Sequence, residues 1–318
     1  MILLVISIAM ATYNGEKYIN EQLSSLLKQS RLADEVIIID DFSNDNTADI
    51  VRKFISKNKL TNWKFFINES NLGYKKNFYQ AISKTTGDLI FLCDQDDIWN
   101  VDKLKCMERI FEENRDIMAL NTRIEYVDKM DKPIDIRGKN IQLENNLANL
   151  KLERNGLNKI DIEAIWKFNI APGCTMGFTK QIKDIYLQKS ECTVYHDWEI
   201  NFIACTMGGL YFYDRPLIKY RIHNNTVGLV GLNKREPRLL DKRISDVYSE
   251  VNRLEQFKKY VLDSENIDRI LQFYIRRYNA LKEKSLAKIL LLHLRYAFMK
   301  NGLTLKNKIG DIVMIIKG

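Results

Sequence analysis

Three carboxylates occupy four consecutive positions of this chain: Asp94, Asp96 and Asp97, directly after the apolar run at residues 89–93. Like charges this close repel one another, so a fold tolerates the cluster most easily when a cation neutralises it. Carboxylate oxygens at the exposed end of a buried strand suit Mg²⁺ or Mn²⁺ that carries phosphate groups. The alternative is a solvated acidic turn that caps the following helix.

Strand and helix patterns alternate through the first 125 residues. Apolar, β-branched runs predict strands at residues 3–10, 35–40, 63–67 and 89–93, and helical patterns lie at 18–28, 48–57 and 75–84. Strands joined by such helices form a mainly parallel sheet with right-handed crossovers. Ligands of these sheets bind beyond the carboxyl ends of the strands. The polar stretches 12–14, 40–41 and 94–97 each end a strand, so an α/β fold with one site at this edge is expected.

The rest of the chain is organised differently. Residues 126–168 are polar and weakly patterned, which indicates an insertion or a flexible loop region near the acceptor side of the site. From about Asp241 onward the pattern is almost wholly helical. We therefore divide the chain into a catalytic domain at 1–230 and a helical region at 231–318.

Composition limits the class of protein. The net charge of +8, from 49 basic and 41 acidic residues, suits an anionic substrate, an anionic membrane surface or nucleic acid. Nucleic acid is not expected as a partner, because the chain has no zinc-finger spacing, no RNP-type motif and no dense Lys/Arg block. Five cysteines without a CxxC pair indicate a reducing compartment.

The apolar N-terminus, residues 1–8, lacks the basic region and cleavage site of a signal peptide and is expected to be a buried strand. No segment reaches the ~18 uncharged apolar residues of a membrane span. We expect a cytoplasmic protein, with peripheral contact at the inner face of the membrane left open.

Six motifs in order resemble the family 2 glycosyltransferases of the GT-A fold. They are ATYNGE at 11–16, DDFSNDNT at 40–47, NLGYKKNF at 71–78, DQDDIW at 94–99, HDW at 196–198 and YRIHNNTVG at 220–228. The DQDDIW form, with the late HDW and YRxHxxNxxG, is most similar to the bacterial rhamnosyltransferase branch that builds surface polysaccharides. The helical tail after about 235 is outside the motifs.

One position departs from the family pattern. Phe42 stands where the family usually has glycine. We therefore expect the turn after Asp41 to avoid the positive φ that glycine adopts freely.

The resemblance implies a nucleotide site. Asp41 matches the carboxylate that accepts a hydrogen bond from the pyrimidine N3–H, although a helix-capping role is the alternative. Tyr13 matches the residue that stacks on the base. The remaining members of the expected nucleotide site are Ala11, Glu16, Lys76 and Asp94.

The resemblance also implies a metal site. Asp96 matches the ligand of Mn²⁺ or Mg²⁺, an ion that neutralises charge on the departing diphosphate. The YRxH placement suggests that His223 reaches the metal or the diphosphate, whereas a structural histidine is the alternative. Arg221 is expected on phosphate oxygens, which suit its forked guanidinium. Asp97 and Trp99 are expected in the same substrate region. The alternative for Asp97 is that it only orients the loop.

Asp197 is the expected general base. It begins an amphipathic helix whose N-terminus would stabilise its negative charge. In the family this position takes the acceptor proton during inverting transfer. An N-cap is the alternative. His196 and Trp198 are expected to shape the acceptor or sugar pocket.

The predicted function is inverting, metal-dependent transfer of a sugar, with L-rhamnose from dTDP-rhamnose as one donor, onto a lipid-linked bacterial surface glycan. The alternatives are a UDP-hexose donor or a non-catalytic nucleotide-sugar-binding subunit, against which the presence of both Asp96 and Asp197 argues. Leu286, Ile289, Leu290 and Leu294 alternate with Lys and Arg in the tail, which suits packing or docking on an anionic membrane leaflet. Homo-oligomer formation stays open.

Overall fold

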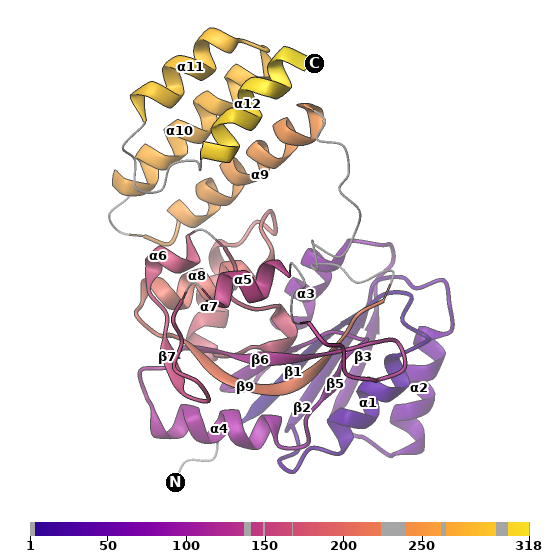
Figure 1. Ribbon diagram of the computed structural model, residues 1–318. Helices are drawn as coiled ribbons and strands as arrows, with labels where there is room; N and C mark the ends of the chain where they lie inside the picture. The colour runs from indigo at the N-terminus through magenta and orange to yellow at the C-terminus, as the bar shows by residue number, and fades with distance from the viewer. Residues whose placement is uncertain are drawn as a thin grey trace. The chain divides into compact units, whose positions relative to one another are not determined.

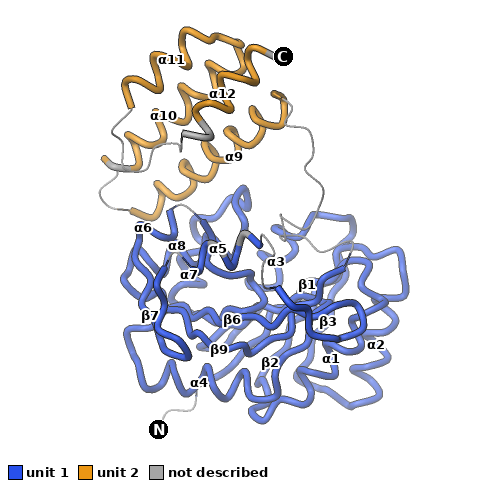
Figure 2. The backbone as a smooth tube through the Cα atoms, viewed as in Figure 1, with its two compact units in different colours: residues 1–232 blue, residues 233–318 orange. Residues whose placement is uncertain are grey.

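The computed structural model describes residues 4–136, 141–148, 150–166, 168–223, 240–261, 265–296 and 305–317. The chain forms two compact units, residues 1–232 and 233–318 (Figure 2). The boundary expected at 230/231 lies outside the described residues, as do positions 224–228 of the last motif.

The first unit is an α/β domain around a nine-stranded sheet, counted over the described residues (Figure 1). Its strands are β1 Ile6–Thr12, β2 Glu35–Asp40, β3 Trp63–Ile67, β4 Leu89–Cys93, β5 Ile98–Trp99, β6 Ala119–Val127, β7 Leu157–Lys159, β8 Gly177–Thr179 and β9 Leu210–Arg221. The order is β3-β2-β1-β4-β8-β6-β9-β5, and β7 pairs with β9. The first four strands pair in parallel, whereas β8 is antiparallel to β4 and β6.

Helices cover both faces of this sheet. They are α1 Ile19–Leu27, α2 Thr47–Lys57, α3 Tyr74–Ser83, α4 Lys103–Glu113, α5 Gln142–Ala148, α6 Ile162–Ile165, α7 Lys180–Lys189 and α8 His196–Thr206, with a 3₁₀ turn, η1, at Gly173–Thr175. Alternate β1 residues, Ile6, Ile8 and Met10, enter one core with the apolar sides of α1, α2 and α4. Helices α3, α7 and α8 pack against one another, and α3 contacts β1 and β2.

The predicted strands at 35–40, 63–67 and 89–93 are confirmed, and the three predicted helices agree to within a residue at each end. The first strand begins at Ile6, later than expected. The expectation of a loop region at 126–168 is wrong for part of that segment. It contains α5, α6 and β7, and β7 is held in the sheet by antiparallel pairing with β9.

The second unit consists of α9 Leu240–Lys258, α10 Glu265–Lys282, α11 Leu286–Arg295 and α12 Leu305–Lys317. Each helix contacts the next, and α12 contacts α9. Val247, Ala280, Leu281 and Ile289 form its apolar centre. None of the described helices combines the length and the apolar character that crossing a bilayer requires.

Candidate active site

The loops that follow β1 and β4 are joined by one amide side chain. Gln95 accepts a hydrogen bond from the backbone N–H of Tyr13 and donates one to its carbonyl oxygen, both at 2.8 Å. A Cβ on Gly15 would lie 2.2 Å from Gln95 Oε1, so a side chain at this position would displace the amide of Gln95 from Tyr13. The sequence reasoning overlooked Gln95, which ties the base-stacking candidate Tyr13 to the acidic loop.

The loop after β2 is ordered by Asp40. Its carboxylate accepts hydrogen bonds from the hydroxyl of Thr12 at 2.8 Å and from the backbone N–H of Ser43 at 2.8 Å. Phe42 adopts a φ of 64°, so the expectation that this turn avoids positive φ is wrong. The bonds on both sides of Phe42 hold it in the left-handed region, which costs a non-glycine residue about 1–2 kcal/mol.

Asp41 fixes the segment that leads into α3. Its carboxylate is 2% exposed and accepts hydrogen bonds from the side chain of Asn68 and from the backbone N–H groups of Leu72 and Gly73, each at 2.8 Å. A carboxylate offers about four acceptor positions, so one is left for a further donor. The helix-capping alternative is not supported, because the N-cap of α2 is Asn46.

The other nucleotide-site candidates differ in environment. Ala11 is buried at the end of β1, and Tyr13 is 42% exposed. Glu16 is exposed and accepts hydrogen bonds from the backbone and side-chain N–H groups of Asn46 at 3.0 and 2.8 Å. Lys76 is exposed on the first turn of α3, within electrostatic reach of the Cys192 thiol.

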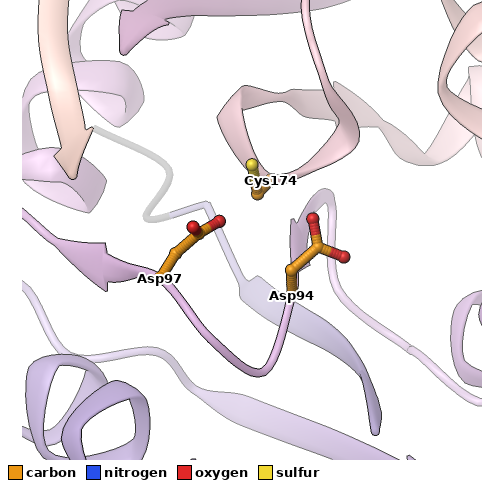
Figure 3. A group of neighbouring side chains, drawn as sticks. All are labelled: Asp94, Asp97 and Cys174. Carbon is orange, nitrogen blue, oxygen red and sulfur yellow. The ribbon is translucent and has the colours of Figure 1, made fainter. Parts of the chain in front are cut away.

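The acidic loop and η1 meet in a tight cluster. One donor atom each from Asp94, Asp97 and Cys174 lie within 4.8 Å of one another, and Figure 3 shows both carboxylates beside the thiol. Burial and the charge of Asp96 raise the pKa of Asp94 to about 7 and raise that of Asp97 well above its usual value. Because the two carboxylates are close together and partly or fully buried, their ionised forms favour a neutralising cation nearby.

The two expected metal ligands are brought together. Nε2 of His223 lies 2.9 Å from Oδ2 of Asp96. Neighbouring ligands of an octahedral ion with bonds of about 2.1 Å lie about 3 Å apart, so these two atoms can bind one divalent cation. Burial raises the pKa of the Cys174 thiol well above its usual value. The protonated thiol is no ligand for Mg²⁺ or Mn²⁺, so the pair of donors that fits is Asp96 and His223.

A buried lysine lies beneath the cluster. Lys103 is 0% exposed, donates a hydrogen bond to the carbonyl oxygen of Cys174 and lies 3.9 Å from the centre of the Trp99 ring. Burial lowers its pKa to about 8. Trp99 itself is 3% exposed and packs on Phe91, so it supports the loop from below and has no surface for the substrate contact expected of it.

Arg221 also has a supporting position. Its side chain is 2% exposed; the backbone N–H donates to Asp97 Oδ1 at 3.0 Å, and the guanidinium donates to the carbonyl of Asp96 at 2.9 Å and to Glu21 at 2.6 Å. This arrangement does not support the expected direct contact of Arg221 with phosphate, because its buried guanidinium already donates hydrogen bonds within the protein. Arg221 instead positions Asp96 and Asp97.

Asp197 lies in the first turn of α8. Burial raises its pKa to about 6, although the backbone N–H groups of Trp198 and Gly173 and the side chain of Asn169 donate hydrogen bonds that lower it. The N-cap of α8 is Tyr195, so Asp197 is not the cap. The charge of Asp197 contributes to the raised pKa of Asp94, so the base candidate lies near the acidic loop.

Both neighbours of Asp197, Trp198 and His196, are held by contacts within the first unit. The indole of Trp198 donates to the carbonyl oxygen of Ile165 at 2.7 Å and joins α8 to α6. His196 is 6% exposed and stacks on Phe78 at 4.1 Å. Neither of its ring nitrogens has a hydrogen-bond partner among the described residues, and burial lowers its pKa to about 3. His196 is therefore a neutral imidazole with a donor and an acceptor to offer.

Comparisons with known proteins agree with this geometry. Residues 7–182 match "Glycosyl transferase family 2". The dTDP-rhamnosyl transferase RfbG of Shigella flexneri is 31% identical over 234 residues, which cover 69% of this chain and 73% of that protein. The poly(ribitol-phosphate) β-N-acetylglucosaminyltransferase TarS of Staphylococcus aureus is 34% identical over 116 residues, or 36% of this chain and 20% of that protein.

Solved structures share the fold. TarS residues 1–349 in complex with UDP-GlcNAc superimpose with a TM-score of 0.58 at 19% identity, covering 98% of this chain and 81% of that one. The mannosyltransferase PcManGT of Pyrobaculum calidifontis, in complex with GDP-Man and Mn²⁺, gives 0.53 at 14% identity, with 98% and 84% covered. The sequence matches together with this fold show that the chain is a glycosyltransferase of the GT-A fold that belongs to family 2.

Proposed function

We propose that this enzyme is an inverting, divalent-metal-dependent transferase that moves L-rhamnose from dTDP-rhamnose onto a growing, lipid-linked bacterial surface polysaccharide. One observation supports the mechanism: the half-buried Asp197 lies beside η1, whose Cys174 adjoins the carboxylates of Asp94 and Asp97, because a Cβ on Gly173 would be 3.4 Å from the Cβ of Asp197. A base and a diphosphate site must flank the anomeric carbon for in-line displacement. The rhamnosyl donor is supported by the name of the relative from Shigella flexneri.

Each residue has a task in this proposal. Asp41 and Tyr13 bind the base, with Ala11, Glu16 and Lys76 around the nucleotide. Asp96 and His223 would hold Mn²⁺ or Mg²⁺, an ion that supplies Lewis-acid stabilisation of the departing diphosphate. Asp94 would face the ribose or a metal-bound water. Arg221, Asp97 and Trp99 keep the loop in place.

Asp197 accepts the proton of the acceptor hydroxyl as that oxygen attacks. A pKa of about 6 leaves the carboxylate ionised at neutral pH while making it a stronger base than an ordinary aspartate. His196, stacked on Phe78, shapes the acceptor or sugar pocket from within. Trp198 holds the start of α8 against α6.

The test is incorporation of radiolabelled rhamnose from dTDP-rhamnose into the lipid extract of a polysaccharide-producing bacterium. We expect incorporation only with Mn²⁺ or Mg²⁺, and a product whose anomeric configuration, read by NMR, is opposite to that of the donor. Full activity in EDTA would contradict the metal requirement, and retained configuration would contradict Asp197 as base.

A second candidate donor is a UDP-hexose, because TarS is a relative and its structure was solved with UDP-GlcNAc. The same assay with UDP-GlcNAc and UDP-glucose separates the two donors. A non-catalytic scaffold is set aside, since the chain belongs to a transferase family. We place the enzyme in the cytoplasm, at the inner face of the membrane, because a lipid-linked acceptor would be met there.

A further inference from the structure

The exposed apolar side chains of the second unit gather on two helices. Among its described residues, the large hydrophobic side chains with high exposure are Tyr248 on α9 and six on α11 and α12: Leu290 (44%), Leu291 (66%), Leu294 (73%), Ile309 (51%), Val313 (40%) and Ile316 (68%). The residues of each helix recur at intervals of one, three or four, so they lie on one side of it. Helices α11 and α12 contact each other, so these exposed apolar sides belong to neighbouring helices.

The described charged side chains of residues 284–310 have one sign. They are Lys284, Lys288, Arg295 and Lys308, and this stretch contains no Asp or Glu. Glu283 precedes the stretch and pairs with Lys288. Helices α9 and α10, by contrast, carry acidic residues in their first turns.

The single carboxylate of α12 is withdrawn from the surface. Asp311 is 0% exposed and accepts hydrogen bonds at 2.8 Å from Arg243 and from two nitrogens of Arg277. Burial raises its pKa, and the hydrogen bonds from His293 and Arg277 outweigh that effect and lower it below its usual range. Asp311 thus stays ionised inside the unit, fixes α12 against α9 and α10, and leaves α12 without an exposed negative charge among its described residues.

We propose that the exposed face of α11 and α12 docks on an anionic phospholipid bilayer, with its leucine and isoleucine side chains below the headgroups and its lysines and arginine at the phosphates. Helix α11 has 10 residues, or about 15 Å at 1.5 Å per residue, against a hydrocarbon core of about 30 Å, so it lies on the surface. Apolar side chains flanked only by cations are the pattern of such interfacial helices. The inference deepens the proposed function and rests on its lipid-linked acceptor.

The experiment is co-sedimentation of the full chain with vesicles of phosphatidylcholine alone or mixed equally with phosphatidylglycerol. We expect binding to the mixed vesicles only, and weaker binding as salt is raised. The variant L291Q/L294Q/I316Q should lower the partition coefficient by about tenfold or more. The matched control L32Q/V101Q/M130Q, with side chains 54%, 50% and 68% exposed in the first unit, should bind like the wild type.

Circular dichroism of both variants checks folding, and sedimentation velocity checks their oligomeric state. Absence of wild-type binding to the mixed vesicles, or equal binding of wild type and L291Q/L294Q/I316Q, would overturn the proposal. Dissociation of a wild-type oligomer by this variant, without vesicle binding, would assign the face to a second copy and also overturn it. Donor binding is measured in parallel, so that a wrong donor and a wrong surface give different results.

Discussion

Burial divides the carboxylates of the site into different roles. Asp40 and Asp41 are buried but accept several hydrogen bonds each, which satisfies their charge and gives them a structural or base-reading task. Asp94 and Asp197 have pKa values raised to about 7 and about 6 by burial. A carboxylate with a raised pKa in such a site is a candidate for cation binding or for base catalysis. The metal candidates adjoin Asp94, so Asp197 is left as the base.

The variant Asp197→Asn is expected to lower the rate of transfer and to raise the stability of the fold. We expect transfer to fall by about 10²–10⁴-fold, the usual contribution of a general base, with donor binding unchanged. The folded pKa of about 6 exceeds the ordinary 3.8, so stability linked to Asp197 is present below about pH 4 and lost as pH rises through 6. Removing the charge at pH 7 should therefore raise the free energy of unfolding, by about 1–3 kcal/mol.

Radiolabel incorporation, calorimetric donor titration and urea unfolding measure these three effects. The matched control is Asp184→Asn, an exposed aspartate paired with Lys180 on α7. Wild-type transfer by Asp197→Asn would remove this residue as the base.

The pH dependence of transfer follows from the same group. The base acts only when ionised, so at saturating Mn²⁺ the rate should rise with pH, with a midpoint near 6, and level off above 7. His196 stays neutral over this range, because its pKa is lowered to about 3, and adds no second step. Initial rates from pH 5 to 8 measure the profile; a rate independent of pH below 6 would contradict the assignment.

Short loops at the carboxyl ends of β1, β2 and β4 are held by side chains that bind a neighbouring loop. Gln95 binds Tyr13, and Asp41 binds Leu72 and Gly73. This mutual fixation keeps the site formed before any ligand arrives, which lowers the ordering cost of binding. It also explains how Phe42 is kept at positive φ.

Phe42→Gly tests that backbone strain. Relief of the left-handed conformation is worth about 1–2 kcal/mol, and the greater freedom of glycine in the unfolded chain costs about 0.5–1 kcal/mol. Since Phe42 is 48% exposed, little burial is lost, and we expect a net gain of about 0.5–1 kcal/mol in urea unfolding. Phe42→Ala keeps the strain and should show no gain. Equal losses in both variants would mean that contacts of the ring outweigh the strain.

Local patterns predicted the strands and helices well, because apolar runs such as 89–93 and the helical periods beside them are properties of neighbouring residues. The meeting of Asp96 with His223 was implied by family resemblance and lies 127 positions apart in the chain. The burial of Lys103 could not be predicted, since a lysine in a helical pattern is ordinarily solvated. The burial of Trp99 and Arg221 could not be predicted either. Trp99 pairs with the distant β9, and the guanidinium of Arg221 contacts Glu21 and Asp96, which are far from it in the chain.

The chain combines two compact units with different surfaces. The first carries the nucleotide-sugar site, and the second carries the apolar and cationic face of α11 and α12. An excess of eight positive charges favours both a diphosphate donor and an anionic membrane. We thus assign binding of the donor to the first unit and access to the acceptor to the second.

Thermal unfolding of the full chain with dTDP-rhamnose, UDP-GlcNAc and UDP-glucose, each with and without Mn²⁺, tests the proposed donor and metal most directly. A ligand at about 100 times its dissociation constant stabilises by about 2.7 kcal/mol, a shift of several degrees. The account predicts a shift with dTDP-rhamnose that requires Mn²⁺ and is absent in Asp96→Ala. A shift with a UDP-sugar alone, or one with dTDP-rhamnose that is unchanged by EDTA and by Asp96→Ala, would contradict it.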